Sequence, residues 1–297
     1  MEVFLQDVRY AIRGLRKSPG FAAAAVVTLA LGMGATTAIF SVVRSVLLAP
    51  LPYAEPGRRV MIWSRWTDFP KTWVSDGEVM DYRRFVPSLE GVAAWGADEA
   101  NLTGGGSEPV RVGIGQITAN TFDTLGARPL IGRGFTESED SPGGEPVAAL
   151  AYGLWQNRFG GDPGVVGRSI ELDGVSRRVV GVMPRGFALP TDFTVKAAEP
   201  SQVFVPVQFD PKELSHGNHG YYAAGLLRRG ATPAQATAEL RALAASLTAR
   251  GEYPPEMRFE AFAEPVDLEI RGPARVALRF VFAAVLFLLL MACANVA

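Results

Sequence analysis

Residues 21–48 read FAAAAVVTLALGMGATTAIFSVVRSVLL, and this stretch decides how the chain is organised. It contains no charged residue before Arg44, and a helix needs about 20 apolar residues to cross a bilayer. We therefore predict a transmembrane helix over residues 20–48. A second apolar run at the other end predicts a second transmembrane helix over residues 275–297.

A cleaved signal peptide is the alternative interpretation of the first run. It would require a shorter apolar core that ends in small residues. Small residues do occur over 32–35, but the apolar run resumes at Ala38, which favours a helix that stays in the membrane. Small and hydroxyl side chains in the run suit close packing against another membrane helix. They are Gly32, Gly34, Thr36, Thr37 and Ser41.

Residues 1–19 have the pattern of an amphipathic helix, which we expect to end at Pro19 and Gly20. Its basic face suits lipid headgroups at the membrane surface, and packing against protein is the alternative. The candidate contact residues are Arg9, Arg13, Arg16 and Lys17. Because these positive charges precede the first span, the positive-inside rule places the N-terminus in the cytoplasm and residues 49–274 outside.

The composition limits the function of this middle domain. The 297 residues carry a net charge of −1, which gives no electrostatic support for nucleic-acid binding. The single cysteine, Cys293, lies in the second apolar run, so the middle domain has no disulfide. Its length of about 225 residues suits one large domain or two small ones.

The middle domain is predicted to have an α+β fold. Ser75 and Glu78 have the spacing of a capping box, and Thr232-Pro233 with Gln235 opens the longest helix. That helix has Ala236, Leu240, Leu243 and Leu247 on one face. The predicted helices are 75–85, 120–125, 152–159 and 232–250, and the predicted strands are 59–63, 110–117, 147–151, 170–172 and 179–182.

No segment of the sequence forms a catalytic set, and we predict no catalytic residue, cofactor or metal. GGDPGVVGRS (160–169) fails as a phosphate loop, because Asp162 replaces the first glycine and Arg168 the lysine. His216 and His219 are expected on a solvated surface, with a metal site requiring outside ligands as the alternative.

Three further clusters have structural interpretations. The acidic residues Glu137, Glu139 and Asp140 are expected at a solvated helix start, where carboxylates favour the helix dipole. Residues 104–106, all glycine, are expected to form a loop tip. Trp63, Trp66 and Trp73 are expected in the domain core, and the membrane interface is the alternative.

The sequence resembles MacB-like (FtsX-like) ABC transporter permeases, and most closely the subgroup of duplicated orphan permeases. The resemblance begins with DVRYAIRGLRKSPGF (7–21) and LALGMGATTAIFSVVRSVLLAPLPY (29–53). The middle is similar to the MacB-like periplasmic core domain. Its matching motifs are NTFDTLGARPLIGRGFTESED (120–140), YGLWQNRFGGDPGVVGRSIELDG (152–174), VVGVMPRGF (179–187) and LLRRGATPAQATAEL (226–240).

The resemblance implies a non-enzymatic permease of the cell inner membrane with a periplasmic core domain of two mixed α/β subdomains over residues 49–274. Relatives are thought to work as dimers that transmit the motion of a separate cytoplasmic ABC ATPase to the periplasm. The implied partners are that ATPase, membrane lipid, a second or paired permease and a periplasmic adaptor. The segment 160–174 becomes a structural turn and strand, and the Arg9–Lys17 face becomes a contact for the ATPase or the inner leaflet.

The chain departs from the family because full permeases have at least two further membrane helices. We therefore expect it to be an N-terminal fragment, with the second span truncated and a natural two-span protein as the alternative. A self-contained membrane-anchored sensor or adaptor module is the second functional hypothesis, and an anchored enzyme is the third. A reading frame that continues past codon 297 with more spans would support the fragment.

Overall fold

The computed structural model describes residues 17, 19–44, 50–103, 108–193 and 200–296. The chain divides into two compact units, which we describe separately. The helical unit comprises Met1–Pro50 and Arg271–Ala297, and the sheet domain comprises Leu51–Ile270. The predicted glycine loop tip at 104–106 lies outside the described residues.

The helical unit contains α2 (Pro19–Val43) and most of α7 (Val266–Val296). Among the described residues, only Ala22–Val43 forms a helix long and apolar enough to cross a membrane. The apolar part of α7, Leu278–Met291, is shorter. The structure therefore supports the first predicted span by length and composition, and the second span remains a prediction.

The hydroxyl groups of α2 bond within the helix itself. The Thr36 and Thr37 hydroxyls donate to the carbonyl oxygens of Gly32 and Met33, at 2.7 and 2.8 Å. Bonds of this kind satisfy a polar side chain without a second helix. Close packing at this face stays a prediction.

One end of the sheet domain is an antiparallel layer with the strand order β12–β1–β11–β4. Alternate residues of β1 point to opposite faces, as strand geometry requires. Val60 and Ile62 enter a core with α3 and α6, whereas Met61 and Trp63 enter a second core on the other face. The elements are β1 (Arg59–Trp66), β4 (Leu89–Thr103), β11 (His219–Leu227), β12 (Glu260–Pro265), α3 (Asp76–Phe85) and α6 (Pro233–Ala249).

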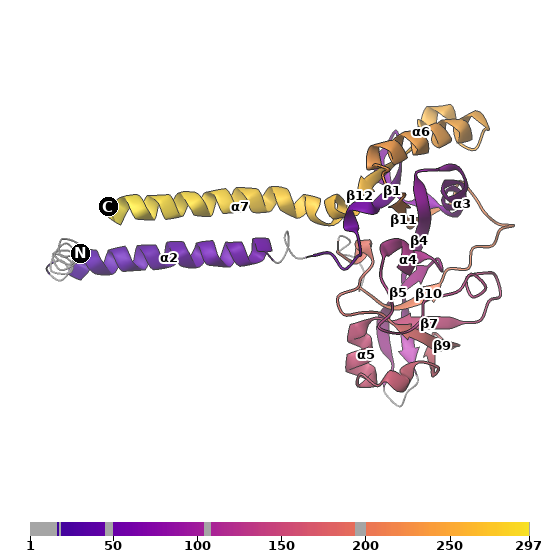
Figure 1. Ribbon diagram of the computed structural model, residues 1–297, viewed down its shortest axis with the longest axis horizontal. Helices are drawn as coiled ribbons and strands as arrows, with labels where there is room; N and C mark the ends of the chain where they lie inside the picture. The colour runs from indigo at the N-terminus through magenta and orange to yellow at the C-terminus, as the bar shows by residue number, and fades with distance from the viewer. Residues whose placement is uncertain (1–16, 18, 45–49, 104–107, 194–199, 297) are drawn as a thin grey trace. The chain divides into compact units, whose positions relative to one another are not determined.

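At the other end of the domain, the sheet closes on itself. The circuit runs β4–β5–β10–β7–β9–β8 and returns to β4, where Leu102 pairs with Leu172. This ring encloses a third apolar core, and α5 lies at this end, away from α6 (Figure 1). The strands are β5 (Val110–Ile117), β7 (Val147–Leu150), β8 (Ser169–Leu172), β9 (Val175–Val182) and β10 (Ser201–Pro206), and the helix is α5 (Tyr152–Phe159).

Short elements complete the domain. β2 and β3 pair with β1 and β11, and β6 pairs with β9. They are β2 (Phe69–Thr72), β3 (Val74–Ser75), β6 (Ile131–Gly132), α4 (Thr121–Leu125), and the 3₁₀ turns η2 (Pro56–Arg58), η3 (Pro163–Val165), η4 (Pro190–Phe193) and η5 (Pro255–Met257).

Both predicted helix starts are confirmed. The Ser75 side chain accepts a hydrogen bond from the Glu78 N–H, and the Glu78 carboxylate accepts one from the Ser75 N–H, which completes the capping box. Thr232 caps α6 through the Gln235 N–H, with Pro233 as the first helical residue. The four apolar residues predicted to share one face of α6 are all buried.

The acidic cluster differs from its prediction, because Glu137, Glu139 and Asp140 lie in a turn and not at a solvated helix start. Glu139 is buried and forms an ion pair of 2.6 Å with Arg133. Asp140 accepts backbone hydrogen bonds from Ala119 and Gln208. Glu139 therefore has a nearby cationic partner, whereas Asp140 accepts from backbone donors that are distant in the sequence and that local spacing does not reveal.

The tryptophans separate into two groups. Trp63 is buried, and Trp66 packs against the core under α3 and α6, so the core prediction is confirmed for these two. The core prediction is wrong for Trp73, which is 46% exposed and whose ring packs edge-to-face with that of Tyr222. The segment 160–174 forms the predicted turn and strand, with Asp162 capping η3 and β8 following.

Candidate functional site

The most informative site of the sheet domain is the first turn of α7. β12 ends at Pro265, α7 begins at Val266, and the helix continues without a break to Val296. Val266 is fully buried, and both it and Ile270 pack in the core that contains Met61. One helix therefore starts inside a packed core and carries the chain into the apolar segment.

Glu269 joins this first turn to the sheet. Its Oε2 accepts hydrogen bonds from Trp63 Nε1 at 3.1 Å and from Lys71 Nζ at 2.5 Å. Lys71 also donates to Glu264 at 2.7 Å and lies 4.6 Å from the centre of the Trp63 ring. We name these four residues the α7 anchor: Trp63 on β1, Lys71 on β2, Glu264 on β12 and Glu269 on α7.

The electrostatics of the α7 anchor favour a fixed joint. Burial raises the pKa of Glu269, while Lys71 opposes that rise. Burial also opposes the charge of Lys71, but its hydrogen bonds to Glu264 and Glu269 outweigh this and raise the Lys71 pKa. The Glu269 side chain is 11% exposed and the Lys71 side chain is 37% exposed, so solvent partly screens the pair and loss of Lys71 should loosen the joint more than it unfolds the domain. The anchor thus holds α7 to three strands.

The sequence contains only a partial signal for this site. Asp267 and Glu269 in a first helical turn, with Val266 and Ile270 one turn apart, are typical of a helix start. The partner Lys71 lies 198 positions from Glu269. No local pattern connects residues so far apart, so sequence analysis missed the pair.

The structure describes one of the four predicted contact residues of the N-terminal segment, Lys17. Arg9, Arg13 and Arg16 lie outside the described residues. Lys17 is helical and exposed. Pro19 is the first residue of α2, and residues 1–16 and 18 of the predicted helix before it lie outside the described residues. The role of this basic face stays a prediction.

The prediction that both histidines lie on a solvated surface is wrong. The His219 side chain is only 9% exposed and its Nε2 lies 3.4 Å from the buried carboxylate of Glu78. His216 contacts Asp81 and Glu252 from two different elements. Within the described ranges, no three His, Cys, Asp or Glu side chains are placed to hold a metal ion.

Comparison with known proteins identifies the family of this chain. Residues 22–243 match the family described as the MacB-like periplasmic core domain. The chain belongs to this family. This MacB-like protein is therefore of the ABC transporter permease type, a type that is generally non-enzymatic. No curated protein matches the chain.

Two solved structures share the fold of the MacB-like domain. One is a domain of a protein from Porphyromonas gingivalis described as a permease, with a TM-score of 0.53 and 15% identity over 72% of this chain and 92% of that one. The other is the periplasmic region of MacB from Actinobacillus actinomycetemcomitans. Its TM-score is 0.52, with 14% identity over 73% of this chain and 91% of that one.

Proposed function

We propose that this MacB-like protein is the membrane permease component of an ABC-type export or mechanotransmission system. It couples a separate cytoplasmic ATPase to a periplasmic domain, and a second copy or a paired permease completes the assembly. The observation that carries the proposal is the course of α7, which begins in the domain core and continues into an apolar segment.

A continuous helix suits mechanical coupling because its backbone hydrogen bonds resist bending and stretching. Any shift of α7 along its axis would act on Val266 and Glu269, and through the α7 anchor on β1, β2 and β12. The Pro-rich connection after α2, with Pro50, Pro52 and Pro56, lacks this continuity. In this proposal α7 transmits motion to the sheet domain, and α2 serves as a second membrane attachment of that domain.

The test uses the full chain in nanodiscs with the ABC ATPase that co-purifies with it. Hydrogen exchange is measured with and without ATP and vanadate. We expect the nucleotide state to change exchange in peptides covering 69–73 and 260–269. ATP hydrolysis that leaves exchange throughout the sheet domain unchanged would contradict the coupling. Failure to recover any ABC ATPase would favour the sensor or adaptor alternative.

Two variants separate coupling from folding. Lys71→Met removes the cation of the α7 anchor, and we expect hydrolysis to continue while the exchange response at 260–269 is weakened. Arg111→Ala is the matched control, because Arg111 forms an exposed ion pair with Glu99 in the ring part of the domain. A Lys71→Met protein with the full response would exclude the anchor as the transmitting joint.

The proposal places the N-terminus in the cytoplasm and the sheet domain in the periplasm, with the second membrane segment formed by α7. The face formed by Arg9, Arg13, Arg16 and Lys17 then contacts the ATPase or the anionic inner leaflet, where each basic residue contributes about 1 kcal/mol. Reversing Arg13 and Arg16 to Glu should reduce ATPase co-purification or membrane association. Retention of both at wild-type levels would remove this role.

A further inference from the structure

The loop of residues 207–218 connects the ring part of the domain, at β10, to the antiparallel layer, at β11. Near its end it lies against the start of α3. The Ser215 N–H donates to Asp76 Oδ1 at 2.9 Å, and the Gly77 N–H donates to the Ser215 carbonyl at 3.4 Å. A Cβ at Gly77 would lie 3.1 Å from the Ser215 carbonyl, so only glycine leaves this approach unhindered.

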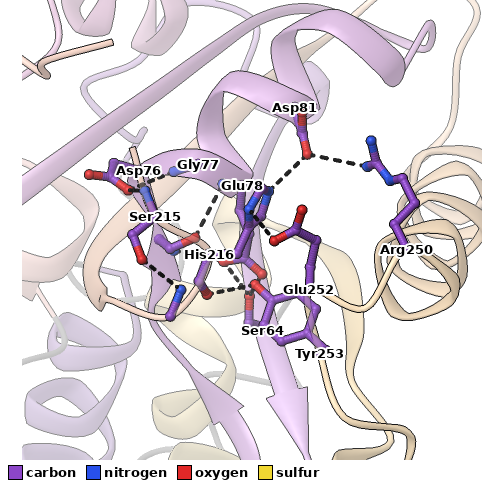
Figure 2. Close-up of polar contacts among 12 residues, drawn as sticks. Ser64, Asp76, Gly77, Glu78, Asp81, Ser215, His216, Arg250, Glu252 and Tyr253 are labelled. Carbon is purple, nitrogen blue, oxygen red and sulfur yellow. Dashed lines mark hydrogen bonds and ion pairs between the residues drawn. The ribbon is translucent and has the colours of Figure 1, made fainter. Parts of the chain in front are cut away.

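His216 lies between two carboxylates from different elements (Figure 2). Its Nε2 is 3.0 Å from Asp81 Oδ2 on α3, and its Nδ1 is 3.4 Å from Glu252 Oε2 in the segment after α6. The His216 carbonyl accepts a hydrogen bond of 2.9 Å from the Tyr253 hydroxyl. One loop residue therefore joins α3 to the segment after α6.

The two contacts depend on the protonation of the imidazole. A neutral imidazole has one N–H donor, and its other nitrogen offers a lone pair, whereas imidazolium donates from both nitrogens. With carboxylates on both sides of His216, the neutral ring can satisfy one and presents its lone pair to the other. Imidazolium donates a hydrogen bond to each carboxylate. Screening of these contacts by water is limited, because the His216 side chain is only 21% exposed.

The other charged groups in contact with this cluster do not replace that proton. Arg250 approaches Asp81 Oδ2 at 3.8 Å and supplies one positive charge against the two carboxylates. Asp76 accepts from the Ser215 and Gly77 N–H groups. His219, the first residue after the loop, faces Glu78, which also accepts hydrogen bonds from the Ser64 hydroxyl and the Ser75 N–H. When His216 is protonated, its positive charge and that of Arg250 balance the two negative charges of Asp81 and Glu252.

We propose that His216 is a proton-dependent latch, which holds the 207–218 loop between α3 and the segment after α6 in mildly acidic solution and releases it in alkaline solution. The contribution of the latch is present at low pH and is lost as pH rises, since only the protonated ring bridges both carboxylates.

The test is hydrogen exchange of the full chain in detergent, read on peptides covering 208–219 at about pH 6 and about pH 8. Rates are corrected for the intrinsic effect of pH on exchange. We expect opening of the loop to be about three- to tenfold rarer at the lower pH, and a tenfold change corresponds to about 1.4 kcal/mol. Equal corrected protection at both values would overturn the proposal.

Variants assign the effect to the right group. His216→Gln should abolish the pH difference, and Glu252→Gln should reduce it while leaving the core intact, because that carboxylate is 44% exposed. His219→Gln is the control and should keep the difference. A full difference in either His216→Gln or Glu252→Gln would overturn the latch. If His216→Gln does not fold, Glu252→Gln alone decides.

Discussion

Buried and half-buried carboxylates accept hydrogen bonds from other segments of this domain. Glu78 joins β1 to the start of α3, and Asp140 joins the segments of Ala119 and Gln208. Asp192 accepts the backbone N–H groups of Leu189 and Ser201. Burial raises the pKa values of Asp140 and Asp192, and the hydrogen bonds to both carboxylates oppose that rise. Each carboxylate works as a structural acceptor for otherwise unpaired donors.

Glu139 provides a test at this scale. Two hydrogen bonds from Arg133, at 2.6 and 2.8 Å, hold the Glu139 pKa at about 2, below its ordinary value of 4.5. A lowered pKa gives stability that is present above pH 4.5 and is lost as the pH falls toward 2. Glu139→Gln should therefore cost about 1–2 kcal/mol at neutral pH and progressively less in acid.

The measurement is chemical unfolding of the full chain in detergent across this pH range. Glu145→Gln is the matched control, because Glu145 pairs with Arg178 at the exposed surface, and it should change stability little. An equal loss for Glu139→Gln at every pH would show that packing, and not charge, is the contribution of Glu139.

At the scale of elements, β4 organises the sheet domain. Its first half pairs with β11 in the antiparallel layer, and its second half pairs with β5. Its last residues, Leu102 and Thr103, also pair with β8 and close the ring. A single strand therefore takes part in both portions of the domain. Its sequence, LEGVAAWGADEANLT, was not predicted as a strand, because its burial pattern changes between the two portions.

Two glycines at opposite ends of α5 make a matched test of helix energetics. Gly153 lies in the first turn, where an added Cβ would meet open space. Gly160 is the C-cap at φ 63°, and a Cβ there would also meet open space. Gly153→Ala should stabilise the domain by about 0.5–1 kcal/mol through the unfolded chain. Gly160→Ala should destabilise it by about 1 kcal/mol, because the left-handed conformation disfavours a Cβ.

Thermal unfolding of the full chain measures both variants, with shifts of about 2–4 °C per kcal/mol for a domain of this size. Equal effects of the two substitutions would show that α5 does not keep its described ends in solution.

At the scale of the whole molecule, membership of the MacB-like family indicates a membrane protein with a domain outside the cytoplasm. The sheet domain buries three apolar cores without a disulfide, and the described free cysteine is Cys293 on α7. This allows single-cysteine labelling after replacement of that residue.

In a Cys293→Ala background, Val175→Cys reports on the sheet domain and Lys17→Cys on the N-terminal side of α2. Val175 is 46% exposed and Lys17 is exposed. A membrane-impermeant maleimide should label Val175→Cys in cells with an intact inner membrane and Lys17→Cys only after lysis. The reverse pattern would show that the positive-inside rule assigned the wrong orientation to this chain.

The sequence by itself determined the apolar segments, the α+β class and the family resemblance. Helix starts such as Ser75 and Thr232 were also predictable, because hydropathy, capping and turn preferences act over a few neighbouring residues. The tertiary structure alone decided the contacts between distant residues. The α7 anchor joins Lys71 to Glu269, and His216 meets Asp81 and Glu252. Packing of strands, helices and loops from distant parts of the chain creates these contacts, and local sequence patterns do not contain that information.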